Sequence, residues 1–286
     1  MDMDFSNLFS VAGKTVVITG GSRGIGEMIA AGFLANGAKV IISSRKADAC
    51  EETVERLKAK YGGEIYAIPS DVGQMVGIEH LANTLAEREE KVDVLVNNAG
   101  VAWGAKLEDF PEHGWDKVMD VNVKGLFFLT QKLMPLLRKA ASADSPARVI
   151  NIASIDGMHT SPMSGFAYGT SKAAVIHLTR FMGAHLAGEH ILCNGIAPGP
   201  FPTYMLSTGV GFKGETEGVD WQKIGDQNPS EHQVQPLKAG CSRACAPACP
   251  RASSAGARAN GSSTAAWCAP QSHRPRSHAP PPRRDC

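Results

Sequence analysis

The chain has 286 residues, of which 43% are hydrophobic and 20% charged, and its formal net charge is +1. This composition is typical of a globular protein and excludes a collagen-like chain or a highly charged chain without a core. No apolar run approaches the roughly 20 residues of a membrane span, and the acidic start MDMDF lacks the basic residues of a secretory signal. We therefore expect a cytoplasmic protein that does not bind or span a membrane.

Charge and cysteine content divide the chain near Pro229. Residues 1–229 carry 21 Lys and Arg against 26 Asp and Glu, whereas residues 230–286 carry 8 against 2. Only Cys50 and Cys193 of the seven cysteines lie in the first part, which favours packed thiols in a reducing compartment over a disulfide framework. We therefore predict one domain over residues 1–229 and a separate tail over residues 230–286.

Short β-branched runs alternate with amphipathic segments through most of the first part. The runs are continuous and apolar, as in parallel strands buried on both faces, and they span residues 14–20, 38–44, 64–70, 92–98, 147–154 and 190–198. The segments between them are typical of helices and span residues 25–36, 46–63, 74–90, 114–140 and 166–190. This alternation predicts an α/β fold with one doubly wound parallel sheet of the Rossmann type.

Three glycines follow the first predicted strand, where the first predicted helix begins. In TGGSRGIG, Gly20 permits a tight turn, Gly24 lets backbone approach a pyrophosphate, and Gly26 allows close packing of helix on strand. The free N–H groups and the dipole of the helix N-terminus favour an anion at this place. The pattern predicts a phosphate site, and a purely structural turn is the alternative. The predicted site consists of Gly20, Ser22, Arg23, Gly24, Ile25 and Gly26.

The end of the second predicted strand indicates which dinucleotide binds. NAD enzymes usually place a carboxylate there for the ribose 2′-hydroxyl, but Ser44 and Arg45 occupy this position, and the next acid is Asp48. A guanidinium pairs with a 2′-phosphate that a carboxylate would repel, and Arg23 adds a second positive charge. We predict NADP(H) as the cofactor, and a solvated surface role stays open for each arginine.

Tyr168 and Lys172 stand four residues apart on the last predicted helix, so their side chains share one face. A free tyrosine, with a pKa of about 10, is a poor acid or base at neutral pH. A lysine cation beside it favours the phenolate, and we therefore expect the pKa of Tyr168 to be lowered. Ser154 ends the fifth strand, 14 residues before Tyr168.

The motifs TGGSRGIG, NNAG, NIAS and YGTSK, in this order, resemble those of the short-chain dehydrogenase/reductase family. The resemblance covers about residues 12–229. It implies that Tyr168 gives a proton to the substrate oxygen, or removes it in the oxidative direction, while Ser154 hydrogen-bonds that oxygen. It also implies that Lys172 holds the nicotinamide ribose and that Asn122, in MDVNVKG, positions a water in a proton relay.

The same resemblance implies further cofactor contacts at the carboxyl ends of the strands. Asp71 and Val72 follow the third strand, and Asn98, Ala99 and Gly100 follow the fourth, where family members contact adenine and stabilise the sheet. A helix N-cap is the alternative for Asp71. In PGPFPTYM, Pro198 and Gly199 match the family's loop against the nicotinamide, and Thr203 matches the position that bonds its carboxamide.

The branch that the motifs resemble contains 3-oxoacyl-carrier-protein reductases and gluconate- and polyol-type dehydrogenases. This resemblance implies reduction of a 3-oxoacyl thioester to a secondary alcohol, with oxidation or reduction of a sugar acid or polyol as the alternative.

Substrate contacts stay open for His159, Met163 and Phe166, and Trp103 is as well suited to the core as to the pocket. His177, His185 and His190 are interpreted as ordinary histidines and Cys193 as inert packing. We expect a homo-oligomer, as is usual in the family, and no nucleic-acid partner or metal.

The tail has a different composition. Residues 230–286 contain two residues of the types Val, Ile, Leu and Phe against eight prolines, which predicts a disordered segment. Family members continue here with further helices and a last strand, so a dinucleotide-binding but catalytically impaired chain is an alternative hypothesis. The spacing of Cys241, Cys245 and Cys249 permits a metal module, but the prolines and the missing core argue against it. The bias towards Ala, Arg, Pro, Cys and Ser favours a shifted reading frame or an alternative end.

Overall fold

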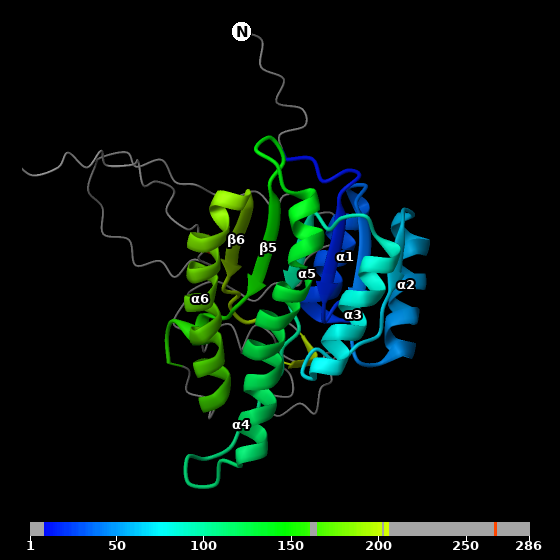
Figure 1. Ribbon diagram of the computed structural model, residues 1–286. Helices are drawn as coiled ribbons and strands as arrows, with labels where there is room; N and C mark the ends of the chain where they lie inside the picture. Colours follow the sequence, from blue (N-terminus) through cyan, green and yellow to red (C-terminus); the bar gives the residue numbers. More distant parts are fainter. Residues whose placement is uncertain (1–8, 161–164, 202, 206–265, 268–286) are drawn as a thin grey trace, which may run out of the picture.

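A parallel β-sheet forms the centre of the described part of the molecule (Figure 1). The structure is a computed structural model, and it describes residues 9–160, 165–201 and 203–205 together with the backbone of 266–267. The strand order is β3-β2-β1-β4-β5-β6-β7, and all pairs up to β6 are parallel. The parallel strands are β1 (Thr15–Thr19), β2 (Lys39–Ser43), β3 (Ile65–Ala67), β4 (Val94–Asn97), β5 (Ala147–Ile152) and β6 (Ile191–Ile196).

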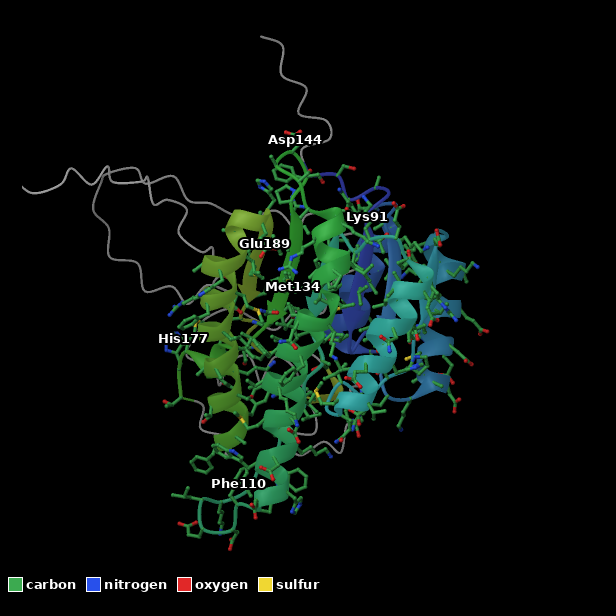
Figure 2. All side chains as sticks on the ribbon, in the orientation of Figure 1. Lys91, Phe110, Met134, Asp144, His177 and Glu189 are labelled. Atoms are coloured by element: carbon green, nitrogen blue, oxygen red, sulfur yellow. The ribbon has the colours of Figure 1, made fainter. Side chains whose placement is uncertain are left out.

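Helices pack on both faces of this sheet. One face carries α1 (Gly24–Ala35) and α2 (Ala47–Tyr61), and the other carries α3 (Met75–Arg88), α5 (Leu126–Ala140) and α6 (Phe166–Leu186). Helix α4 (Glu112–Met119) extends beyond the carboxyl ends of the strands, and Phe110 lies there, at the opposite end of the molecule from Asp144 (Figure 2). The predicted doubly wound Rossmann-type sheet is confirmed.

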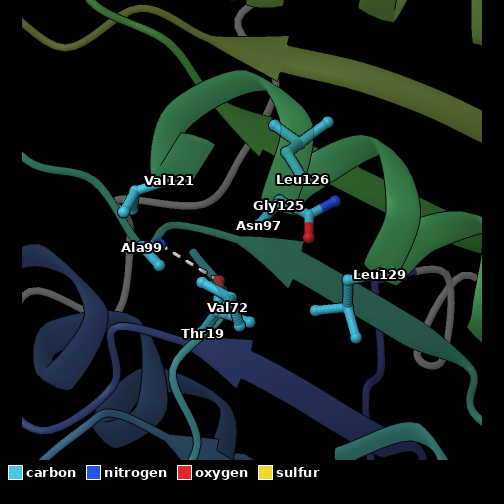
Figure 3. Close-up of a pocket in the computed structure, with 8 residues that line it drawn as sticks. All are labelled: Thr19, Val72, Asn97, Ala99, Val121, Gly125, Leu126 and Leu129. Carbon is cyan, nitrogen blue, oxygen red and sulfur yellow. Dashed lines mark hydrogen bonds between the residues drawn. The ribbon is translucent and has the colours of Figure 1, made fainter. Parts of the chain in front are cut away.

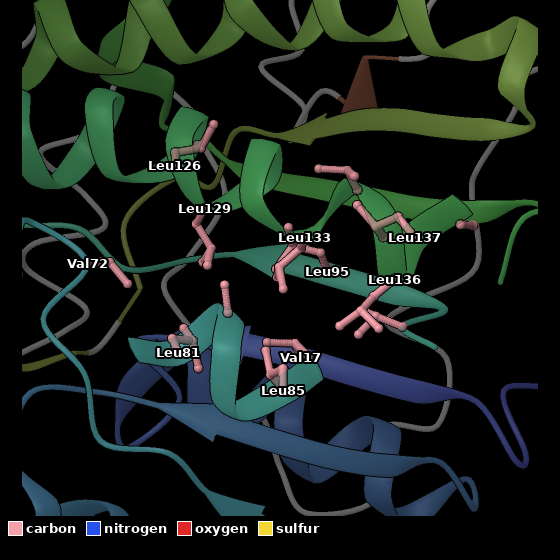
Figure 4. Close-up of a cluster of buried hydrophobic side chains, with 14 of the residues drawn as sticks. Val17, Val72, Leu81, Leu85, Leu95, Leu126, Leu129, Leu133, Leu136 and Leu137 are labelled. Carbon is pink, nitrogen blue, oxygen red and sulfur yellow. The ribbon is translucent and has the colours of Figure 1, made fainter. Parts of the chain in front are cut away.

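Alternating strand residues divide the core into two clusters. Val17 and Leu95 face the helices α3, α5 and α6, and the leucines of α5 fill this side (Figure 4). Val16 and Val94 face α1 and α2 in the second cluster. Burying each such side chain contributes about 1.5–3 kcal/mol, so the two clusters fix which face every strand residue takes. The polar ends of the strands are thereby held at one edge.

Polar side chains tie the two central strands to the helices above them. Asn97 of β4 and Asn151 of β5 are neighbours in register. The Nδ2 of Asn97 donates to Asn151 Oδ1 at 2.9 Å and to Thr130 Oγ1 at 3.0 Å, and Asn151 Nδ2 donates to Thr179 Oγ1 at 2.9 Å. This buried chain of hydrogen bonds connects α5, β4, β5 and α6.

The predicted helix over residues 114–140 is wrong as a single α-helix. The π-helical turn η1 (Asp120–Gly125) separates α4 from α5. Gly125 lies so close to α3's leading loop that an added Cβ would be 2.3 Å from Val72 O, and Asn122 is pinned to the backbone of Val101. These tertiary contacts hold the wider turn, and the helix-breaking Pro135 lies ten residues beyond it, within α5. Wide turns of this kind occur often at functional sites.

One short strand at the outer edge of the sheet comes from residues 230–286, which the sequence analysis predicts to be disordered. The backbone of β7 (Ala266–Trp267) pairs antiparallel with Gly195 and Ile196 of β6. An edge strand presents unpaired N–H and C=O groups, and this dipeptide satisfies part of that row. Within the described residues, positions 191–194 have no strand on that side. The remaining predictions for residues 230–286, including the cysteine spacing, lie outside the described residues, and the boundary at residue 229 stays a prediction.

The turn between β1 and α1 depends on the missing side chain of Gly26. A Cβ at this position would lie 2.2 Å from Gly20 O and 2.5 Å from Asn98 Nδ2. Both neighbours are held, because Asn98 Nδ2 donates to the carbonyls of Thr19 and Gly20. Neither neighbour can therefore move away from an added methyl group without breaking the hydrogen bonds that join the loops after β1 and β4.

We expect Gly26→Ala to lower the free energy of unfolding by about 1–3 kcal/mol, because the methyl group must displace fixed backbone. Gly32→Ala is the matched control on the same helix, since its Cβ would meet nothing within 4 Å. That control is expected to gain about 0.5–1 kcal/mol from reduced backbone entropy. Urea unfolding of both variants measures the difference, and equal effects would contradict the close packing at Gly26.

Candidate active site

The loops after β1 and β4 are hydrogen-bonded to each other. Thr19 Oγ1 accepts from the backbone N–H groups of Asn98 and Ala99, each at 3.0 Å (Figure 3). Gly20 and Gly24 have φ values of +66° and +58°, a region that favours glycine. The strand order reverses between β1 and β4, and open α/β sheets bind their ligands at such a point. The structure thus brings the predicted glycine loop and the NNAG segment side by side at the carboxyl ends of the strands.

The predicted adenosine end lies where the glycine loop meets the loop after β2. The backbone N–H of Ser22 donates to Ser44 Oγ at 3.4 Å. Arg23 and Arg45 are both exposed beside this contact. The guanidinium of Arg23 lies 4.4 Å from the centre of the Tyr204 ring, so a cation–π contact engages it in this structure. Arg45 is the more accessible partner for a phosphate.

The loop after β3 lies next to the loops after β1 and β4. Asp71 Oδ1 accepts from the N–H of Gly73 at 3.0 Å, so its carboxylate forms a local turn. Helix α3 has Gln74 as its N-cap, and the N-cap alternative for Asp71 is therefore wrong. Val72 lines a narrow hollow together with Thr19, Ala99 and Val121 (Figure 3).

Tyr168 and Ser154 meet through their side chains. Tyr168 lies in the first turn of α6, and Ser154 follows β5 as the N-cap of the short turn η2 (Ile155–Gly157). Ser154 Oγ accepts from the N–H of Asp156 at 3.2 Å and is hydrogen-bonded to the Tyr168 side chain. The serine hydroxyl is thus fixed on one side by backbone and directed at the phenol on the other.

Lys172 is buried one helical turn after Tyr168. Only 4% of this residue is exposed, and its Nζ lies 5.6 Å from the centre of the Tyr168 ring. Nζ donates to Ile152 O at 2.8 Å, which attaches α6 to the end of β5. Burial lowers the pKa of Lys172 to about 8 because the interior disfavours the ammonium.

The pKa of Tyr168 is raised, contrary to the sequence expectation. Burial of the phenol is the largest cause, and the negative charge of Asp156 adds to it, while the hydrogen bond with Ser154 lowers the pKa. Burial also raises the pKa of Asp156 itself. Tyr168 therefore holds its proton at neutral pH, which is the form that can donate.

Asn122 lies in the π-helical turn and is 1% exposed. Its Oδ1 accepts from Val101 N at 2.8 Å, and its Nδ2 donates to Val101 O at 3.0 Å and to Ser171 Oγ at 2.9 Å. The amide of Asn122 is fully engaged with protein groups. A Cβ placed on Gly100 would lie 3.5 Å from both Asn122 Oδ1 and Lys172 Nζ, so this glycine separates the two side chains. The four predicted side chains thus gather in one place.

The segment after β6 contacts two other parts of the predicted site. Pro198 O accepts from the N–H of Ile155 at 3.1 Å, and Gly199 follows directly. A Cβ on Gly24 would lie 3.4 Å from the methyl group of Thr203. This segment therefore contacts the Ser154 turn through Pro198 and the glycine loop through Thr203.

The structure also locates the residues that sequence left open. Trp103 packs on α4, since its ring lies 5.0 Å from the ring of His113 and touches Gly114. Phe166 is 45% exposed with its ring 6.2 Å from that of Phe110, and His159 is exposed. Met163 lies outside the described residues. Burial raises the pKa of Cys193 to about 12, which agrees with an inert thiol. The histidines 177, 185 and 190 are exposed.

Two residues that contact the site were missed by the sequence analysis. Asp156 stands two residues after Ser154, and Ser171 stands next to Lys172. Neither residue type at these spacings is unusual in a turn or a helix. In the part of the chain that the structure describes, no group of three His, Cys, Asp or Glu side chains is arranged for a metal, and no helix is long and apolar enough to span a bilayer.

The residues present fit a dinucleotide. The glycine loop has no room for side chains at Gly26, the N-terminus of α1 lies at the carboxyl ends of the strands, and a buried lysine stands beside a protonated tyrosine. Such a combination on a doubly wound sheet defines an NAD(P)-dependent oxidoreductase.

Comparisons with known proteins give the family. The family model described as short chain dehydrogenase matches residues 14–210, and the chain belongs to this family. A rhamnolipids biosynthesis 3-oxoacyl-[acyl-carrier-protein] reductase of Pseudomonas aeruginosa is 51% identical over 197 residues, which is 69% of this chain and 76% of the relative. A 5-keto-D-gluconate 5-reductase of Escherichia coli is 37% identical over 205 residues, 70% of this chain and 76% of the relative. The solved Pseudomonas aeruginosa RhlG/NADP active-site complex is similar with a TM-score of 0.73 and 44% identity, covering 79% of this chain and 86% of that one.

The lowered pKa of Lys172 predicts a pH dependence of stability. The unfolded chain binds this proton up to about pH 10.5, whereas the folded chain releases it near pH 8. The free energy of unfolding is therefore expected to rise between these values, by about 2 kcal/mol from pH 7 to pH 9.5 at 1.36 kcal/mol per pKa unit. Lys172→Met, which removes the titrating group, is expected to lack this rise.

Urea unfolding of both proteins across this pH range measures the effect, and the difference between them cancels all other titrations. Parallel curves for the wild type and Lys172→Met would show that the folded lysine titrates at its ordinary pKa.

Proposed function

We propose that this chain reduces a ketone to a secondary alcohol with NADPH and that the ketone is a 3-oxoacyl thioester. The observation that carries the reaction type is the hydrogen-bonded pair of Ser154 and protonated Tyr168 beside the buried Lys172. The substrate class is supported by the similarity to the 3-oxoacyl-[acyl-carrier-protein] reductase.

The proposed roles follow from the geometry. The bound dinucleotide supplies a hydride to the carbonyl carbon. Tyr168 donates its phenolic proton to the carbonyl oxygen, so hydride and proton together give the alcohol. Ser154 hydrogen-bonds the same oxygen and orients it towards the phenol. Lys172 is placed to hold the ribose hydroxyls and to stabilise the phenolate that remains.

Asn122 has the least direct role in this proposal. Its side-chain amide is already bonded to Val101 and Ser171, so contact with a water in a proton relay falls to its main-chain carbonyl. A π-helical turn shifts carbonyls out of the usual i to i+4 pattern, which supports this assignment.

The remaining cofactor contacts are proposals of the same kind. They place the pyrophosphate on residues 20–26, the adenine beside Asp71 and Val72, and the nicotinamide beside Pro198 and Gly199. The preference for NADPH rests on the absence of a carboxylate at the end of β2 and on exposed Arg45. A cytoplasmic location and a homo-oligomer complete the proposal, and Phe181, 54% exposed on α6, is surface that a second subunit would cover.

Two other functions have support of their own. Similarity to the 5-keto-D-gluconate 5-reductase favours a sugar acid or polyol as the substrate. A chain that binds a dinucleotide without turnover is supported by the family match, which ends at residue 210, and by the partly unpaired edge of β6 within the described residues.

We expect the chain to reduce a 3-oxoacyl thioester with NADPH. We expect Tyr168→Phe to lower kcat by about 10²–10⁴-fold, because phenylalanine has no hydroxyl group to donate a proton. Stopped-flow or steady-state absorbance of NADPH measures the rates, and NADPH fluorescence shows whether binding persists in the variant. If the enzyme turned over 5-ketogluconate or a polyol but no 3-oxoacyl thioester, the proposed substrate class would be wrong and the sugar-acid or polyol alternative would replace it. NADPH binding without turnover of any of these would favour the impaired chain.

We expect Arg45→Ala to raise the KM for NADPH roughly tenfold or more, because a charge-assisted hydrogen bond to the 2′-phosphate is lost, while the KM for NADH stays unchanged. Arg148→Ala is the matched control, since this arginine is also exposed and, within the described residues, its guanidinium donates only to Pro146 O. Equal changes for NADPH and NADH, or for both variants, would exclude Arg45 from phosphate recognition.

A further inference from the structure

The hydroxyl of Ser171 links two of the proposed active-site residues. Ser171 lies on α6 between Tyr168 and Lys172 and is fully buried. Its Oγ accepts from Asn122 Nδ2 at 2.9 Å and donates to Tyr168 O at 2.7 Å. One hydroxyl thus connects the π-helical turn to the first turn of α6.

We propose that Ser171 is a positioning residue, which holds Asn122 and the π-helical turn in the arrangement that the reaction needs. The proposal rests on the proposed function for its kinetic part.

The argument begins with the amide of Asn122. Nδ2 has two hydrogens, one bonded to Val101 O and the other to Ser171 Oγ, and the site is buried. Without the serine hydroxyl, one buried N–H has no partner, and buried polar groups rarely stay unpaired. The amide is then expected to turn or the π-helical turn to shift, and either change displaces the backbone of Asn122.

The opposing explanation is that Ser171 only satisfies a helix carbonyl. Serine and threonine hydroxyls often bond back to a carbonyl three or four residues earlier, with no role beyond the helix. A control that shares this chemistry is therefore required.

Thr179 is such a control on the same helix. It is 5% exposed, accepts from Asn151 Nδ2 at 2.9 Å, and donates to Val175 O at 2.7 Å. Both hydroxyls join a buried asparagine amide to a carbonyl of α6. They differ in the asparagine, since Asn151 lies in β5 and Asn122 lies in the π-helical turn beside Lys172.

The kinetic test compares Ser171→Ala with Thr179→Val, each of which removes the hydroxyl with little change of shape. Ser171→Ala is expected to lower kcat at least tenfold with less than a threefold change in the KM for NADPH. Thr179→Val is expected to leave kcat within threefold while losing a similar amount of thermal stability. Equal kcat values for the two variants would overturn the proposal.

A double-mutant cycle tests whether Ser171 acts through Asn122. In the Asn122→Ala background, Ser171→Ala is expected to have less than a twofold further effect on kcat, because its partner is absent. Thr179→Val is expected to have the same effect in both backgrounds. A full tenfold loss from Ser171→Ala without Asn122 would overturn the proposed route.

An activity-independent measurement keeps this inference separate from the proposed function. In protein labelled with ¹⁵N-asparagine, hydrogen exchange of the Asn122 side-chain amide is expected to be at least tenfold faster in Ser171→Ala than in the wild type or Thr179→Val. Unchanged exchange would overturn the positioning role even in an active enzyme. An inactive wild type with this pattern would refute the proposed reaction and leave the positioning of Asn122 intact.

Discussion

The burial of the Lys172 ammonium is the constraint on which the rest of the site depends. Within the described residues, its one hydrogen bond goes to Ile152 O, and no carboxylate pairs with it. The buried Asp93 at the opposite, amino-terminal ends of the strands differs, since the Thr15 N–H, Lys14 and Lys91 outweigh the cost of its burial and lower its pKa. A cation with so few partners is costly, and proteins retain such costs mainly at functional sites.

The sheet and the helix packed on it hold Lys172 in this buried position. Lys172 reaches Ile152 only because α6 is held against β5, where Val175 and Met182 of the helix share one buried cluster with Val149 of the strand. Strands β4 and β5 deliver the loops of the site, because β4 ends at the NNAG segment and β5 ends at Ser154. Distances within the site are therefore set by backbone pairing in the sheet, which changes little between conformations, rather than by flexible side chains.

Much of this arrangement could be predicted from local sequence. The six strands are apolar runs that only a sheet covered on both faces can bury, and Gly26 and the spacing of Tyr168 and Lys172 have a meaning that needs no tertiary information. The π-helical turn could not be predicted, because its causes are contacts between segments far apart, Gly125 with Val72 and Asn122 with Val101. The raised pKa of Tyr168 was missed for the same reason, since burial is a property of the assembled core, and burial together with the charge of Asp156 outweighs the hydrogen bond with Ser154.

The two pKa shifts together give a direction to proton movement in the proposed reaction. The pKa of Lys172 falls to about 8, while that of Tyr168 is raised above its ordinary value of 10. In the proposed reaction, the phenolate that Tyr168 leaves behind is first stabilised by the Lys172 ammonium and, as the stronger base of the two, then takes a proton from it. A fixed carboxylate beside Lys172 would raise its pKa and hold its proton in place. The absence of such a partner within the described residues therefore fits a lysine that gives up a proton in the proposed reaction.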